Sequence, residues 1–394
     1  MTSHARDAPL LIIAGETSGD QHGAAIVRVL REDFPDLPVF GVGGGHLRAA
    51  GVETLFDIET LNVMGLVEVL AKVPSGLLMA RRLLRAARER GTRVVVLIDA
   101  PGFNLPFARW AKQAGLRVVY YVSPQIWAWR QGRVHKVARR VDKMLTLFPF
   151  EVPFYAAAGV DAEYVGHPFL DCLPALPDRT QAARTLGLDA QRPIVALLPG
   201  SRRREVELLL EPMLAALSLI RHDLPEVQGI LPVAPTVSDT VQPIVSGFSG
   251  ALTVVDGQSL TALCAADFAL VASGTATLEA GLIGAPMVIV YRVNRLTAWL
   301  AKRLLRVPHI GLINIVAGRR VVPELLQEAV SPRTLAALAL SVLQDPAEAR
   351  RIREELTALR ATMGEGGSSR RAAASVGVVL RQARDGRADA RVSG

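Results

Sequence analysis

The feature that most constrains the fold is a repeated order along the chain: a short apolar run, a glycine-rich turn, and then an amphipathic stretch. The run Pro9–Ala14 leads into GETSGD and then into QHGAAIVRVLRE. Val39–Val42 and Arg93–Ile98 are followed in the same way by GGGHLRAAG and DAPGFNLPFARWAKQAG. Short apolar runs bounded by turn residues are typical of strands buried on both faces, and their alternation with helices predicts a parallel sheet covered by helices.

A second series of the same kind begins at Pro193. Its predicted strands are Ile194–Leu198, Gly229–Val233, Leu252–Val255, Phe268–Ala272 and Met287–Val290. The 394 residues should therefore form two doubly wound, Rossmann-like α/β domains with a cleft between them. We expect an N-terminal domain over 1–178 and a C-terminal domain over 179–364. In the last segment, 365–394, a helix can pack back on the first domain ahead of a disordered tail.

Composition narrows the classes of function. Lys and Arg number 45 against 37 Asp and Glu, and the resulting net charge of +8 favours anionic partners such as nucleotides, phosphorylated substrates or phospholipids. The two cysteines, Cys172 and Cys264, exclude a disulfide framework. No apolar run reaches the roughly 20 residues of a membrane-spanning helix, and the first residues lack a signal-peptide pattern. We expect a cytoplasmic protein that can still touch a membrane from that side.

The turn after the first predicted strand is a candidate ligand site. Gly15, Ser18 and Gly19 bring backbone N–H groups and a hydroxyl to a helix N-terminus, which suits a phosphate or a sugar hydroxyl. The carboxylates of Glu16 and Asp20 would repel a pyrophosphate. A purely structural turn with Asp20 as a helix cap explains the same residues equally well, so both interpretations stay open.

Two turns of the second domain are better candidates for an anion. Gly200, Ser201 and Arg202 follow one predicted strand and open a helix, which puts the guanidinium at the positive end of the helix dipole. A second such turn holds Ser273, Gly274, Thr275 and Thr277, with Glu279 placed to accept hydrogen bonds from ribose hydroxyls. Each turn alone could be a simple helix cap. Two of them in one domain favour a nucleoside diphosphate.

Asp99 directly follows the apolar run Val94–Ile98, so its carboxylate is expected at the carboxyl edge of the first sheet. It suits general-base catalysis on a sugar hydroxyl, and the alternative is a helix cap. Farther along, Ser123, Trp127 and Trp129 stand in YYVSPQIWAWR. Aromatic rings beside an arginine can form a sugar platform, or they can pack against a neighbouring domain.

The segment Leu61–Leu84 reads LNVMGLVEVLAKVPSGLLMARRLL and starts a series of arginines at Arg81. An apolar stretch beside a basic helix suits a surface that meets acyl chains and anionic headgroups. A core helix followed by a solvated basic helix fits the same pattern, and periodicity does not separate the two.

Taken in order, these strings resemble one family. AGETSGDQHGA, VGGGHLRAAG, NVMGLVEVL, DAPGFNLPFA, YYVSPQIWAWRQGRV, FPFE, VGHP, LLPGSRRREV, ASGTATLEA and NIVAGRRVVPELLQ are similar to the motifs of lipid-A-disaccharide synthases, over the range from Leu10 to Gln327. The resemblance implies the GT-B glycosyltransferase fold and transfer of 2,3-diacylglucosamine from UDP to 2,3-diacylglucosamine 1-phosphate. It also implies inversion at the anomeric carbon, no metal or other cofactor, a homodimer, and a peripheral position on the cytosolic face of the inner membrane.

The resemblance assigns Asp99 as the general base, with Glu16 as the other candidate. The positions it implies for substrate binding are Gly15, Ser18, Gly19, Asp20, Met64, Gly65, Asn104, Ser123, Trp127, Trp129, Gly200, Ser201, Arg202, Ser273, Gly274, Thr275, Thr277, Glu279, Tyr291 and Asn314. The chain departs from the family where Gly102 replaces a second aspartate and where Arg204 replaces a serine before Glu205. The first departure leaves Asp99 as the acidic residue of that string.

Two other hypotheses remain at this stage. One is a different UDP-sugar enzyme of the same architecture, such as a UDP-N-acetylglucosamine epimerase or a peptidoglycan glycosyltransferase. The apolar segment Leu61–Leu84 argues against an epimerase of soluble sugars. The other is a basic nucleic-acid-binding protein, which the charge permits. Aromatic residues make up only 5% of the chain, however, and it contains no recognised nucleic-acid-binding module.

Overall fold

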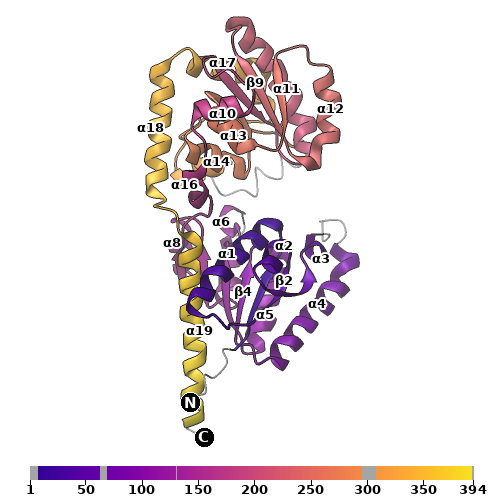
Figure 1. Ribbon diagram of the computed structural model, residues 1–394, viewed down its shortest axis with the longest axis vertical. Helices are drawn as coiled ribbons and strands as arrows, with labels where there is room; N and C mark the ends of the chain where they lie inside the picture. The colour runs from indigo at the N-terminus through magenta and orange to yellow at the C-terminus, as the bar shows by residue number, and fades with distance from the viewer. Residues whose placement is uncertain (1–7, 63–68, 130, 295–307, 393–394) are drawn as a thin grey trace. The chain divides into compact units, whose positions relative to one another are not determined.

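The computed structural model describes residues 8–62, 69–129, 131–294 and 308–392. It divides the chain into two compact units (Figure 1). The first unit contains Met1–Asp171 and Glu365–Gly394, and the second contains Cys172–Gly364. Each unit has one parallel sheet with helices packed around it, which confirms the predicted class of two parallel-sheet α/β domains.

The sheet of the first unit has the strand order β3-β2-β1-β4-β5-β6-β7. Its strands are β1 (Leu10–Ala14), β2 (Val39–Gly43), β3 (Glu53–Asp57), β4 (Val94–Ile98), β5 (Arg117–Tyr121), β6 (Lys143–Thr146) and β7 (Ala162–Tyr164). The chain builds outward from β1 to β3 and then returns to place β4 on the other side of β1. Such a reversal leaves a crevice outside the carboxyl ends of the two central strands, where ligands bind in folds of this kind.

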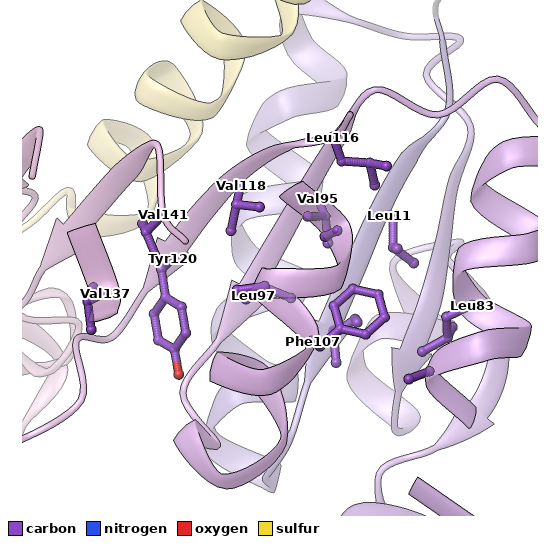
Figure 2. Packing of buried hydrophobic residues seen from close by; sticks show 14 of the residues in the cluster. Leu11, Leu83, Val95, Leu97, Phe107, Leu116, Val118, Tyr120, Val137 and Val141 are labelled. Atoms are coloured by element: carbon purple, nitrogen blue, oxygen red, sulfur yellow. The ribbon is translucent and has the colours of Figure 1, made fainter. Parts of the chain in front are cut away.

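Helices connect these strands and cover both faces of the sheet. They are α1 (Thr17–Asp33), α2 (Gly45–Ala49), α3 (Glu59–Asn62), α4 (Val69–Glu89), α5 (Pro101–Gln113), α6 (Ile126–Trp129), α7 (Val134–Ala138), α8 (Glu151–Ala156), α9 (Phe169–Cys172) and α19 (Ser368–Val392). Figure 2 shows one side of the core, where Leu11, Val95 and Val118 project from neighbouring strands. Leu83 of α4 and Phe107 of α5 cover them. Each such side chain stabilises the fold by about 1.5–3 kcal/mol when fully buried, which is why the central strands are apolar throughout.

The last helix, α19, packs against α1 in the first unit (Figure 1). Its start is fixed by Asp171, whose carboxylate accepts hydrogen bonds from the Gly367 backbone N–H and from the Ser368 hydroxyl, the latter at 3.0 Å. These bonds tie Asp171 to the first unit, so the boundary lies after residue 171 and not after 178 as the sequence suggested. The helix runs to Val392 where a disordered tail was expected, and its Ala- and Arg-rich sequence has high helix propensity.

The sheet of the second unit has the order β10-β9-β8-β11-β12-β13 and the same reversal between its two central strands, β8 and β11. Its strands are β8 (Ile194–Leu198), β9 (Gln228–Val233), β10 (Leu252–Asp256), β11 (Phe268–Ala272), β12 (Met287–Tyr291) and β13 (Glu324–Leu326). Its helices include α10 (Arg179–Thr185), α11 (Arg203–Asp223), α12 (Ser238–Ser246), α13 (Ser259–Ala265), α14 (Thr275–Ile283), α16 (Leu312–Ala317), α17 (Pro332–Leu343) and α18 (Pro346–Thr362).

Candidate functional site

In the first unit, the turns after β1 and β4 touch one another beside the reversal point. The contact is close at Gly15, where an added Cβ would lie 2.0 Å from the Cβ of Ala100. Only glycine therefore fits at this position without moving the turn after β4. The contact brings Glu16 and Asp99, the two candidate bases, to the same part of the carboxyl edge.

The Asp99 turn has a strained backbone. Asp99 and Ala100 have φ angles of 50° and 42°, in the left-handed region that non-glycine residues rarely adopt. The amide of Asn104 holds this geometry by donating to the carbonyls of Ile98 at 3.1 Å and Asp99 at 2.8 Å. The Tyr120 hydroxyl donates to the Asp99 carbonyl at 2.6 Å. Asn104 is fully buried and its NH₂ group supports the Asp99 turn, whereas the sequence suggested a substrate-binding position.

Burial and, as a smaller cause, the negative charge of Glu16 together raise the pKa of the Asp99 carboxyl to about 6. A carboxylate with this pKa is still largely ionised at pH 7, and it is a stronger base than an ordinary aspartate. A base whose pKa lies near the working pH is the most effective proton acceptor in general-base catalysis. A raised pKa suits a general base, and the assignment of Asp99 as that base stays a prediction.

Asp20 has a different role from the predicted one. Its side chain is buried and accepts three backbone hydrogen bonds, from Gly44 at 2.6 Å, His46 at 2.8 Å and Leu47 at 3.2 Å. Both carboxylate oxygens thus cap α2 instead of facing a substrate, and the helix capped is not the one that follows the turn. Ser18, in the same turn, stays exposed, whereas Gly19 is buried.

The turn after β5 also differs from the prediction. Ser123 and Trp127 are buried, and both donate a hydrogen bond to the carboxylate of Glu151, the tryptophan through Nε1 at 3.0 Å. Neither polar group faces solvent. The sequence did not assign a role to Glu151, although it ends the FPFE string. The sequence signal for a buried role of Glu151 is its position in FPFEVPFY, where a carboxylate stands among aromatic and apolar residues.

In the second unit, the two predicted anion turns meet in one pocket of about 430 Å³. Gly200, Ser201 and Arg202 line one side, and Ser273, Gly274, Thr275 and Glu279 line the other. The turns follow β8 and β11, the two strands that flank the reversal point. The N-termini of α11 and α14 start at these turns, so free N–H groups and the positive helix ends border the pocket.

Two acidic side chains complete this pocket. Glu205 pairs with Arg202 at 3.0 Å and lies against Gly200, whose φ of 110° requires glycine. The Arg202 side chain is 82% exposed, so it is free to turn toward a ligand at little cost. Glu279 is half-buried, and burial raises the pKa of its carboxyl.

Other predicted ligands lie outside the pocket. The hydroxyl of Thr277 is buried and bonds to the Gly274 carbonyl at 2.8 Å and the Leu312 N–H at 3.0 Å. The amide of Asn314 is buried and satisfied by the Val321 and Val322 backbone and by Glu324. Both side chains therefore hold local structure. Tyr291 ends β12 and does not line the pocket, whereas Met64, Gly65 and the Trp129 side chain lie outside the described residues.

A larger groove, of about 940 Å³, lies at the opposite, amino edge of the first sheet. Its lining includes four arginines, namely Arg85, Arg88, Arg93 and Arg117. Three of these arginines have partners within the chain. Arg85 pairs with Glu89 at 2.7 Å, Arg93 donates to the Ala383 carbonyl at 3.2 Å, and Arg117 lies 3.9 Å from Asp142.

The described residues contain neither a membrane-spanning helix nor a cluster of metal-ligating side chains. No helix in the described ranges is long and apolar enough to cross a membrane. Among the same residues, no three His, Cys, Asp or Glu side chains come together in a way that could hold a metal ion.

Comparison with known proteins identifies the family. The family model described as "Lipid-A-disaccharide synthetase" matches residues 10–376. The chain belongs to this family. Lipid-A-disaccharide synthase from Trichlorobacter lovleyi is 45% identical over 372 residues, which cover 94% of this chain and 97% of that protein. The enzyme of the same name from Myxococcus xanthus is 44% identical over 370 residues, or 93% and 96% of the two chains.

Solved structures share the fold at much lower sequence identity. A UDP-N-acetylglucosamine 2-epimerase from Neisseria meningitidis, bound to UDP-GlcNAc, has a TM-score of 0.63 at 12% identity and covers 95% of this chain and 100% of its own. The calicheamicin glycosyltransferase CalG4 has a TM-score of 0.58 at 16% identity, with 95% and 98% covered. These likenesses show the GT-B fold alone. Membership of the lipid-A-disaccharide synthetase family makes the chain a glycosyltransferase of lipid A assembly, and it excludes the epimerase and nucleic-acid-binding hypotheses.

Proposed function

We propose that this lipid-A-disaccharide synthetase binds the UDP part of UDP-2,3-diacylglucosamine in the pocket of the second unit and activates the acceptor at Asp99 of the first unit. The observation that carries the proposal is the same in both units: the two turns that flank the reversal point meet. In the second unit they form an anion pocket. In the first unit they bring a carboxylate with a raised pKa beside Glu16.

The proposed reaction is a single inverting displacement. The 6-hydroxyl oxygen of 2,3-diacylglucosamine 1-phosphate attacks the anomeric carbon of the donor sugar, and its proton passes to the Asp99 carboxylate. The bond between that carbon and the phosphate oxygen breaks, and its electron pair leaves with UDP. The products are the β-1,6-linked disaccharide 1-phosphate and UDP. Glu16 is the alternative proton acceptor.

Negative charge grows on the departing diphosphate, and the pocket offers groups that stabilise it. Arg202 supplies a guanidinium, and the N-termini of α11 and α14 supply N–H groups aligned with the positive helix ends. Glu279 would accept hydrogen bonds from the ribose hydroxyls.

The deciding experiment incubates the purified chain with radiolabelled UDP-2,3-diacylglucosamine and 2,3-diacylglucosamine 1-phosphate. A disaccharide product with equimolar UDP supports the proposal, and no UDP release under any condition contradicts it.

Replacing Arg202 by alanine should weaken UDP binding by about 10- to 150-fold, since a charge-assisted hydrogen bond contributes about 1.5–3 kcal/mol. Titration calorimetry with UDP measures the effect. The matched control is Arg203→Ala, because Arg203 pairs with Glu207 at 2.9 Å and does not line the pocket. Equal UDP affinity in the Arg202 and Arg203 variants would remove Arg202 from the binding site.

We also propose that the segment Leu61–Leu84 meets the acyl chains and the cytosolic face of the inner membrane. Residues 63–68 lie outside the described chain, but the described part of α4 has two faces. Met79 and Leu83 are buried in the core, whereas Leu78 is 50% exposed. The basic side chains that accompany Leu78 on the exposed face are Arg81, Arg82, Arg85 and Arg88.

Vesicle binding tests this surface. Replacing Val67, Val69 and Leu70 by serine should reduce co-sedimentation with phosphatidylethanolamine–phosphatidylglycerol vesicles. Replacing Arg81 and Arg82 by glutamate should reduce it as well, because each arginine near an anionic surface contributes about 1 kcal/mol. Leu326→Ser, on an exposed leucine of the second unit, is the control. Binding that is insensitive to salt and unchanged in both variants would contradict the proposal.

The family also suggests a homodimer, which sedimentation equilibrium of the wild type would detect.

A further inference from the structure

Glu151, the first residue of α8, is one of the few buried charged side chains among the described residues, with 2% of its surface exposed. Its carboxylate accepts four hydrogen bonds. One oxygen, Oε1, accepts from the Ser123 hydroxyl and from Trp127 Nε1 at 3.0 Å. The other, Oε2, accepts from the backbone N–H groups of Leu147 at 3.1 Å and Phe148 at 3.0 Å. Four donors fill the acceptor positions of an ionised carboxylate.

These donors come from two separate segments of the chain at the carboxyl edge of the first sheet. Ser123 belongs to the connection between β5 and α6, Trp127 to α6 itself, and Leu147 and Phe148 to the connection between β6 and α8. Glu151 therefore links the ends of two neighbouring strands through one side chain. Removing it would leave all four donors buried and unpaired, and such groups are costly.

The loop that Glu151 holds is strained. Val122 has a φ of 65°, which is rare for a β-branched residue and persists only where the surroundings enforce it. The bonds from Ser123 and Trp127 to Glu151 fix the residues that follow. The Tyr155 hydroxyl, also from α8, donates to the Pro124 carbonyl at 3.0 Å. Side chains of α8 therefore hold the conformation of the loop that follows β5.

The segment before this loop is hydrogen-bonded to the Asp99 turn on the neighbouring strand. The Asp99 N–H donates to the Tyr121 carbonyl at 3.0 Å, and the Tyr120 hydroxyl donates to the Asp99 carbonyl at 2.6 Å. The strained residues at the ends of β4 and β5 are therefore side by side on adjacent strands. A shift of the β5 loop would move the surface next to the proposed base.

We propose that Glu151 is a positioning residue for the acceptor sugar, because it holds the strained Val122–Trp127 loop in place beside Asp99 through hydrogen bonds to Ser123 and Trp127. This inference rests on the proposed function of Asp99. Glu151 acts through the loop and need not touch the substrate. Burial raises the pKa of the Glu151 carboxyl to about 7, and the four hydrogen bonds oppose that shift. Ser123 and Trp127 then contribute by orienting backbone, where the sequence suggested direct substrate contact.

The test is Glu151→Gln, which keeps the size of the side chain. A glutamine presents one oxygen and one NH₂ group, so it satisfies one pair of donors and places the NH₂ group against the other. We expect the KM for the acceptor to rise about 10- to 100-fold, while the Kd for UDP stays within about twofold of wild type. A merely structural role would reduce the amount of active enzyme, which lowers kcat and leaves both KM values unchanged.

Asp142→Asn is the matched control. Asp142 is a half-buried carboxylate at the amino edge of the same strands, where it accepts from the Val118 N–H at 2.7 Å and from Lys112 at 2.6 Å. Its loss should lower the melting temperature and leave the acceptor KM unchanged. An equal rise in the acceptor KM in both variants would overturn the proposal.

A double-mutant cycle traces the effect to the loop. Trp127→Phe removes the Nε1 donor together with part of the buried ring and should raise the acceptor KM by less than Glu151→Gln. In the Glu151→Gln background the same change should have a smaller effect, because the bond is already disturbed. Fully additive effects would overturn the proposal.

If Glu151→Gln does not fold, Trp127→Phe and Ser123→Ala provide the test, and an unchanged acceptor KM in both variants is the contradicting result. Wild-type enzyme that makes no disaccharide would instead refute the proposed function.

Discussion

Replacing Asp99 by asparagine should lower kcat by about 10²–10⁴-fold, which is the usual contribution of a general base. Asparagine keeps the shape of the side chain but does not take the proton of the acceptor hydroxyl. The Kd for UDP should stay unchanged, since the proposed UDP pocket belongs to the second unit. Steady-state kinetics with both substrates and calorimetry with UDP measure these quantities. Asp161→Asn, on an exposed carboxylate that pairs with Lys143 at 3.0 Å, is the control.

The pH profile gives the same prediction an independent check. The Asp99 carboxyl must be ionised to act as a base, so kcat/KM of the wild type should fall about tenfold per pH unit below pH 6. The residual activity of Asp99→Asn should lack this limb. Wild-type turnover in Asp99→Asn would contradict the assignment and leave Glu16 as the candidate.

The contribution of Asp99 to the free energy of unfolding should fall as the pH rises, whereas the activity that depends on Asp99 should increase. The pKa of Asp99 is higher in the folded chain than its ordinary value of 3.8, so folding favours the protonated form. The stability that this group contributes is fully present below its ordinary pKa and is lost as the pH rises through about 6. Asp99→Asn avoids burying that charge, so its melting temperature at pH 8 should not fall below that of the wild type.

Replacing Gly15 by alanine should lower the free energy of unfolding by about 1–3 kcal/mol and reduce kcat as well. The new Cβ would lie 2.0 Å from the Cβ of Ala100, so the turn that carries Asp99 must move. Urea denaturation and steady-state kinetics measure the two effects. Gly102→Ala is the control, because a Cβ at Gly102 meets no atom within 4 Å and alanine favours the helix.

A second substitution should reverse this damage. Ala100→Gly removes the clashing Cβ and leaves the Ala100 Cα 3.4 Å from the added methyl group, and glycine also suits the φ of 42° at that position. The double variant Gly15→Ala with Ala100→Gly should therefore recover most of the stability and of the turnover. A double variant as impaired as Gly15→Ala alone would show that the contact between the two turns is not the cause.

The sequence by itself predicted the class of fold and most of the central strands. The runs at Leu10–Ala14, Val94–Ile98, Ile194–Leu198 and Phe268–Ala272 are apolar throughout because helices cover both faces of a parallel sheet, and this requirement is visible without coordinates. The turns after these four strands also contain the candidate catalytic residue and the pocket residues. A ligand site at the carboxyl end of a central strand follows from connectivity, which the order of elements along the chain encodes.

Four strands toward the sheet edges, β3, β6, β7 and β13, were not predicted from the sequence, whereas the edge strand β10 was. β3, β6, β7 and β13 carry polar or half-exposed residues, and they are short. A strand of this kind is stabilised by hydrogen bonds to a neighbour that is distant in sequence, so its own residues give little signal. The boundary between the two units after residue 171 was not predicted for the same reason, because the carboxylate of Asp171 binds groups near residue 367.

Only the tertiary structure showed which of the polar residues support the turns and which line the candidate sites. Asp20, Asn104, Ser123, Thr277 and Asn314 all follow strands or open helices, and sequence patterns therefore grouped them with Asp99 and Ser273. Their side chains instead bond to backbone or side-chain groups that packing brings near, such as the N-terminus of α2 for Asp20 and Glu151 for Ser123. A polar side chain at a turn satisfies its hydrogen bonds with whatever group lies within about 3 Å, and that neighbour is chosen by the packing of the whole unit.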